Sequence, residues 1–211
     1  MKGLTRLAML MLLASVYAVA QLKVGSISSL EQLRAALKAG ESIKVGTTQI
    51  NSVRFANELR IAHDRTMAVL TGQSTGALAL FKADGRLTAV IETGRLVSYQ
   101  FAELGRDGTE GILTDEILGI GTGVVIRRFK LYSPADNQEI KVLWQAPSYV
   151  LKAPWSNGEP SPEVSEEYGY VRFDPGSGVY PARISYAFRD RSGHWSVKLY
   201  SLASGTVRAI N

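Results

Sequence analysis

The stretch Ala77–Ile91, which reads ALALFKADGRLTAVI, indicates the fold class. Two apolar runs, Ala77–Phe81 and Leu87–Ile91, flank the pair Asp84-Gly85, and this arrangement is a strong signal for a β-hairpin. Short β-type runs separated by turn residues continue through most of the chain after residue 40. We therefore expect a mainly β protein built from antiparallel sheets.

One short helix is expected near the N-terminus, over residues 29–39. Ser28 and Glu31 have capping-box spacing, and leucines recur at helical intervals from Leu30 onward. Residues 55–63 are compatible with either a helix or a strand.

Two segments, Met67–Gly94 and Ile112–Ala146, share one order of features. Each has a strand, a Thr-Gly pair, an apolar run, a turn and another strand. A repeat of about 40 to 50 residues with several strands per unit is typical of β-propeller blades. An ordinary antiparallel meander produces the same pattern, so propeller-like repeats and a meander are both compatible with the sequence.

The run Leu104–Leu113 (LGRDGTEGIL), followed by Gly119–Gly123 (GIGTG), resembles one degenerate unit of the FG-GAP/VCBS repeats of integrin-type β-propellers. The resemblance covers about 40 residues. It implies a propeller-like scaffold for binding, not catalysis. The family's loop carries several acidic calcium ligands, and here only Asp107 and Glu110 occupy such positions.

The first twenty residues have the pattern of a cleavable export signal. Lys2 and Arg6 precede the apolar run Leu7–Val16, and Ala18–Ala20 supplies the small residues that signal peptidase reads. The predicted mature chain is a single β-rich domain, residues 21–211, in the periplasm or outside the cell. We expect no membrane span after cleavage, because no later stretch is long and apolar enough.

Charge and cysteine content exclude several classes of function. Loss of Lys2 and Arg6 lowers the formal net charge from +5 to +3, and no basic cluster suggests nucleic-acid binding. The chain has no cysteine, which excludes disulfides, thiol catalysis and thiolate metal sites.

The segment Gly72–Gly76 (GQSTG) matches the nucleophile-elbow pattern around Ser74, and His194 follows after possible acids. An elbow requires a helix after the serine, but the apolar run and Asp-Gly turn that follow leave room for one strand. We therefore predict that Ser74 is not a nucleophile, with a secreted hydrolase using Ser74 as the alternative.

We expect no cofactor and no metal. The weak alternative is a calcium site formed by Asp107, Glu110 and Asp115, but calcium prefers six to eight oxygen ligands. The two histidines, His63 and His194, are too few for a transition-metal site without cysteine.

A long proline-rich loop is predicted over about residues 147–168. The candidate binding residues in or beside it are Trp155, Tyr149, Tyr168 and Tyr170. Exposed loop aromatics often contact ligands or proteins, although they can also fix a loop onto its sheet. The expected function is an exported, non-catalytic binding or structural module with a protein or glycan partner. An accessory subunit of an envelope assembly is a further alternative.

The export signal makes the first testable prediction. Intact-mass measurement of the protein from its producing cells should give a chain that begins at Gln21, because Ala18 and Ala20 provide the cleavage signal. An uncleaved chain recovered from the cytosol would contradict it.

Overall fold

The computed structural model describes most of the chain after residue 25. The described residues are 26–39, 42–51, 53, 55–62, 65–104, 110–121, 123–135, 139–153, 155–156, 159–160, 164–176, 180–203 and 206–210. The predicted export signal, His63 and Asp107 lie outside these ranges.

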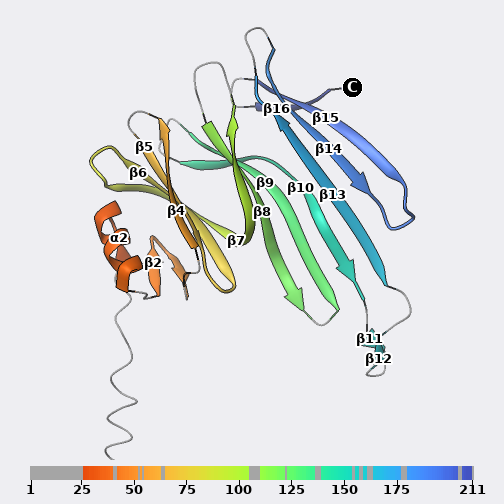
Figure 1. Cartoon of the computed structure of the whole chain (residues 1–211), viewed down its shortest axis with the longest axis horizontal. Helices are drawn as coiled ribbons and strands as arrows, with labels where there is room; N and C mark the ends of the chain where they lie inside the picture. The colour runs from red at the N-terminus through yellow and green to blue at the C-terminus, as the bar shows by residue number, and fades with distance from the viewer. Residues whose placement is uncertain are drawn as a thin grey trace, which may run out of the picture.

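The described elements are one helix and a series of strands in the order shown in Figure 1. They are β1 (Ser26–Ile27), α2 (Leu30–Ala39), β2 (Ile43–Val45), β3 (Thr48–Ile50), β4 (Phe55–Ala62), β5 (Arg65–Thr71), β6 (Thr75–Lys82), β7 (Leu87–Glu103), β8 (Glu110–Gly121), β9 (Val124–Pro134), β10 (Ile140–Lys152), β11 (Trp155–Ser156), β12 (Glu159–Pro160), β13 (Ser165–Asp174), β14 (Ala182–Arg189), β15 (Trp195–Ala203) and β16 (Thr206–Ile210).

The prediction of a mainly β protein with antiparallel sheets and one short helix is confirmed. Eleven strands form one antiparallel meander in the order β16-β15-β14-β13-β10-β9-β8-β7-β6-β5-β4. Strands β1 to β3 make a small separate sheet beside α2 (Figure 1). The propeller-like arrangement is not confirmed, because these strands are joined in one sheet instead of separate four-stranded blades.

Helix α2 begins with a cap one residue later than the sequence suggested. Ser29 Oγ accepts a hydrogen bond from Gln32 N at 3.2 Å, and Gln32 Oε1 accepts one from Ser28 N at 2.9 Å. The capping pair is therefore Ser29 with Gln32, not Ser28 with Glu31. Within the described part of the chain, no helix has the length and apolar character that crossing a bilayer requires.

Two connections differ from the simplest reading of the sequence. The ambiguous segment 55–63 contains strand β4. The proline-rich connection is shorter than predicted, because β10 continues through Pro147 to Lys152 and β13 begins at Ser165. Pro147 is tolerated there because a register shift separates it from Tyr149, and irregularities in a ladder accommodate residues without a backbone N–H.

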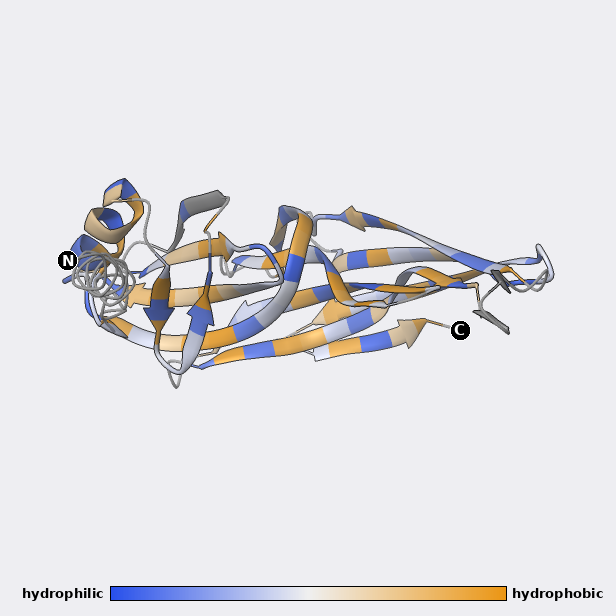
Figure 2. Ribbon diagram, turned by 90° about the horizontal axis from the view of Figure 1, so that it is seen from below, coloured by the Kyte–Doolittle hydropathy of each residue, from blue (hydrophilic) through white to orange (hydrophobic). Residues whose placement is uncertain are grey.

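The core has three parts, and the β5–β6 hairpin separates two of them. One face of this hairpin, including Leu70 and Phe81, packs under α2 and the small sheet. The other face, including Met67 and Leu78, packs on β8 and β9. The third part lies between the opposite face of β8–β10 and strands β13–β15. Figure 2 shows apolar residues recurring along strands throughout the molecule.

Strand β7 turns the corner between strands β4 to β6 and the strands from β8 onward. It pairs with β6 as far as Gly94 and with β8 from Arg95 onward. A Cβ at Gly94 would lie 2.3 Å from the carbonyl oxygen of Ile117, so only glycine permits this approach. One strand thereby belongs to two packed layers.

A fully buried carboxylate fixes this corner. Glu116 Oε2 accepts hydrogen bonds from Gly94 N and Lys130 Nζ, each at 3.0 Å. Its other oxygen accepts from Thr114 Oγ1 at 2.7 Å and from the Tyr132 hydroxyl at 2.6 Å. Burial, together with the Glu116 charge, raises the pKa of Tyr132. The Glu116 side chain thus ties β7 to β8 and β9.

Replacing Glu116 tests this role. Glu116→Ala would leave the half-buried Lys130 ammonium and the buried Tyr132 hydroxyl without their partner, so we expect a loss of about 3–5 kcal/mol in unfolding free energy. Denaturant unfolding would measure it. The control is Glu139→Ala at an exposed carboxylate, with an expected change under about 0.5 kcal/mol. Similar unfolding free energies for the two variants would contradict the structural role.

Candidate functional site

Strands β13 to β16, the C-terminal part of the large sheet, pack one face on β10, and we call this the inner face. Ser196 and Lys198 of β15 also lie on the inner face but are exposed. The Trp144 ring of β10 makes edge contacts with Tyr186 and Tyr200, at centroid distances of 5.6 and 5.7 Å. The Tyr186 hydroxyl also donates a hydrogen bond to the Pro147 carbonyl at 2.8 Å. A Cβ at Gly169 would lie 2.1 Å from that carbonyl oxygen, which explains the glycine. The sheet is therefore held against β10 by aromatic contacts.

The opposite, outer face of this sheet carries apolar side chains in adjacent positions. The unbroken register aligns Tyr170 with Ala187 and Ala187 with Val197. Leu199 lies opposite Ile210. Side chains directly opposite each other in a ladder point to the same face. We define the outer patch as Tyr170, Trp195, Val197, Leu199 and Ile210.

All five side chains of the outer patch are exposed. The exposed fractions are 57% for Tyr170, 54% for Trp195, 67% for Val197, 42% for Leu199 and 41% for Ile210. The rings of Tyr170 and Trp195 contact each other at a centroid distance of 5.6 Å. Contiguous exposed apolar side chains, unlike scattered ones, mark interaction surfaces.

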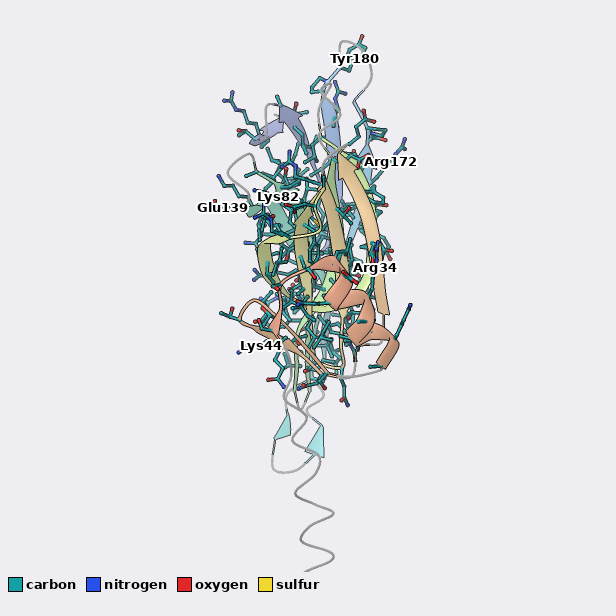
Figure 3. The ribbon with its side chains drawn as sticks, turned by 90° about the vertical axis from the view of Figure 1, so that its left-hand side faces the viewer. Arg34, Lys44, Lys82, Glu139, Arg172 and Tyr180 are labelled. Atoms are coloured by element: carbon teal, nitrogen blue, oxygen red, sulfur yellow. The ribbon has the colours of Figure 1, made fainter. Side chains whose placement is uncertain are left out.

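Four arginines share the outer face with the patch. Arg189 lies between Tyr168 and Trp195 in the register, and the others are Arg172, Arg183 and Arg208. Figure 3 shows Arg172 at the periphery of the molecule. Arg172 pairs with Asp174 at 2.8 Å. Among the described residues, no carboxylate lies within ion-pair distance of the other three. Asp174 also lies directly opposite Arg183 in the ladder, and Glu166 shares this face with Tyr168. The four arginines outnumber these two carboxylates, so the face has an excess of positive charge.

The structure brings together three of the four predicted binding residues. The Tyr149 and Tyr168 rings lie 5.3 Å apart, and Tyr170 follows Tyr168 on the same face of β13. Both hydroxyls of the first pair donate to the Glu166 carboxylate. The hydrogen bond to Glu166 raises the pKa of Tyr168 to about 12. Trp155 belongs to β11, whose side chains are outside the description.

Sequence reasoning missed Trp195, Val197, Leu199 and Ile210. The alternation in Trp195–Leu199 predicts a strand with its apolar side chains inward, whereas the structure places them outward. The sequence did contain a sign of this second apolar face, because Leu199 and Tyr200 are consecutive apolar residues and interrupt the apolar–polar alternation of the strand. Both faces of β15 are apolar around that point, which indicates a second contact surface.

The weak calcium alternative is not assembled by the described residues. Glu110 and Asp115 lie on β8 with opposite strand parity, so their side chains point to opposite faces. Asp115 already accepts hydrogen bonds from Ser148, at 2.6 Å, and from Arg127. Within the described ranges, no group of three potential metal-ligating side chains comes together.

Ser74 lacks the context of a catalytic nucleophile. The residues after it form β6, a strand instead of a helix. His194 lies in the β14–β15 turn, and strands β7, β8, β9, β10 and β13 separate β6 from β14 in the sheet order. His194 Nδ1 lies 2.7 Å from Ser192 Oγ, which itself donates to Asp190 at 2.6 Å. In a catalytic triad the acid orients the histidine, whereas here both groups bond the serine.

A polar pocket of about 330 Å³ lies elsewhere, at the ends of β7 and β8. Its lining includes Glu103 and Glu110, which lie directly opposite each other in the ladder. Phe101 and Phe173 complete much of the wall. Among the described lining residues, the polar groups are these two carboxylates and the Gln100 amide.

Comparisons of this chain with protein-family models, with curated proteins and with solved structures gave no match. The resemblance to FG-GAP/VCBS repeats therefore stays a prediction.

The strand after Ser74 leads to a direct test. A fluorophosphonate probe should leave the purified chain unlabelled, because the residues that follow Ser74 form a strand instead of the helix that an elbow requires. In-gel fluorescence would measure the labelling. A signal that disappears in Ser74→Ala would support the hydrolase alternative instead.

Proposed function

We propose that this chain is an exported, non-catalytic binding module of the cell envelope or secreted fraction. It contacts its partner through the outer patch and the surrounding arginines. The observation that carries this proposal is the set of five adjacent exposed apolar side chains on strands whose other face supplies part of the core.

Several features of the C-terminal sheet suit a preformed contact surface. Strands β13 to β16 pair in continuous register without a bulge, and their inner face packs on Trp144. Because packing of the inner face on Trp144 already fixes these strands, little conformational entropy is lost when a partner covers the outer patch. Tryptophan and tyrosine are also the residue types that contribute most to many contact surfaces.

Adjacent positions on β15 provide a matched test. Val197 lies on the outer face, and its neighbour Ser196 is exposed on the inner face. Val197→Asp places a carboxylate within the contact, whereas Ser196→Asp adds the same charge outside it. Burial of an unpaired charge is costly, so Val197→Asp should weaken binding about tenfold or more.

The measurement is cosedimentation of the purified mature chain with a washed envelope fraction of its producing cells. The wild type and Ser196→Asp should appear in the pellet, and Val197→Asp should remain in the supernatant. Equal behaviour of the two variants, or a wild type that does not sediment, would refute the proposed function.

A further inference from the structure

The outer face carries both apolar side chains and arginines, and an envelope surface can bind both. Its centre is apolar, and Arg189 and Arg208 lie around that centre with no ion pair to a carboxylate among the described residues. Arg183 lies opposite Asp174, and this carboxylate pairs with Arg172. A partner must therefore offer negative charge beside an apolar phase. Packing the same face of a second copy against it would instead bring arginines together, which is unfavourable.

The apolar residues distinguish a lipid from a carbohydrate. Val197, Leu199 and Ile210 have no hydrogen-bonding groups, so they cannot recognise the hydroxyls of a glycan. At a lipid surface these side chains gain free energy by leaving water. Tryptophan and tyrosine, here Trp195 and Tyr170, are enriched where membranes meet water. Arginines beside them can pair with anionic phosphate groups.

We propose that the partner of the outer patch is a membrane surface that contains anionic phospholipid. The chain lies on that surface with Trp195 and Tyr170 at the headgroup level, and Arg189, which lies beside Trp195 in the register, pairs with lipid phosphate. This inference rests on the proposed function, because it names the partner of the same face.

The test uses the purified mature chain with two kinds of vesicle. One contains phosphatidylcholine alone, and the other contains equal parts of phosphatidylcholine and phosphatidylglycerol. We expect stronger binding to the mixed vesicles, and weaker binding as ionic strength rises, because salt screens exposed charges. Equal binding to both vesicle types, or none to either, would overturn the lipid proposal.

Matched charge variants locate the contact on one face of β15. Arg189→Gln removes a cation beside Trp195 and should weaken binding to the mixed vesicles about fivefold. Lys198→Gln removes an equal charge from an exposed position on the inner face and should change the affinity little. An equal loss in both variants would mean attraction by net charge alone and would overturn the proposal.

Fluorescence gives an independent reading of depth. Brominated acyl chains quench nearby tryptophan, so vesicles that carry them should quench the emission of the wild type. The effect should fall sharply in Trp195→Phe while vesicle binding persists. The chain has three tryptophans, so any signal left in Trp195→Phe comes from Trp155 or from Trp144, which is buried in the core. Quenching that is unchanged in Trp195→Phe would contradict the orientation.

The two proposals fail differently. If Val197→Asp abolishes sedimentation with the envelope fraction but the wild type ignores every vesicle, the partner is an envelope protein or glycan and the lipid proposal is wrong. If Val197→Asp has no effect on either sedimentation or vesicle binding, the outer patch is not the contact surface, and both proposals fail.

Discussion

The corner between Gly94 and Glu116 is the contact on which the arrangement of layers depends. The backbone N–H of Gly94 in β7 donates a hydrogen bond to the buried Glu116 carboxylate of β8. Gly94 is the last position at which β7 pairs with β6, and from Arg95 onward β7 pairs with β8. Burying a carboxylate costs free energy unless the group is fully hydrogen-bonded. Three of the four donors to Glu116 come from the neighbouring strands β7 and β9, so the carboxylate is satisfied only when these strands are paired with β8. Because β7 also pairs with β6, the hydrogen bonds of Glu116 fix the β5–β6 hairpin relative to β8 and β9.

This corner determines which faces of the meander are covered. The β5–β6 hairpin is buried on both sides, by α2 and the small sheet on one and by β8 and β9 on the other. The opposite face of β8 to β10 receives the inner face of β13 to β15. Within the described chain no further layer follows, so the outer face of the C-terminal sheet faces solvent. Its apolar side chains are the feature that the packing leaves unexplained and that a binding role accounts for.

Local signals predicted the elements better than their arrangement. Asp84-Gly85 produced the expected hairpin because its turn is decided by residues in contact with one another, with Gly85 at a φ of 80°. The outcome at Glu116 depends on Lys130 and Tyr132, whose approach follows from strand pairing and cannot be read from neighbouring residues. Pro147 illustrates the same limit, since a bulge beside it allowed a strand where composition indicated a loop.

For the candidate site as well, the sequence predicted some of the residues but not how the fold brings them together. Tyr149, Tyr168 and Tyr170 were selected for their residue type and neighbourhood, and the register of β10 with β13 brings the first two into contact. Trp195 joins them from a strand that begins 25 positions after Tyr170. Because alternation along β15 cannot tell which face is covered, only the tertiary arrangement identifies Val197 and Leu199 as exposed.

The most direct measurement asks whether the outer patch is uncovered in the free protein. Methyl NMR of the mature chain with a soluble paramagnetic agent reports the solvent exposure of each labelled side chain. The account predicts strong relaxation enhancement, independent of protein concentration, for Val197, Leu199 and Ile210, and weak enhancement for the buried Ile184 and Leu202. Protection of the first group to the level of the second would show that the patch is covered within the protein or by another copy, and would contradict the account.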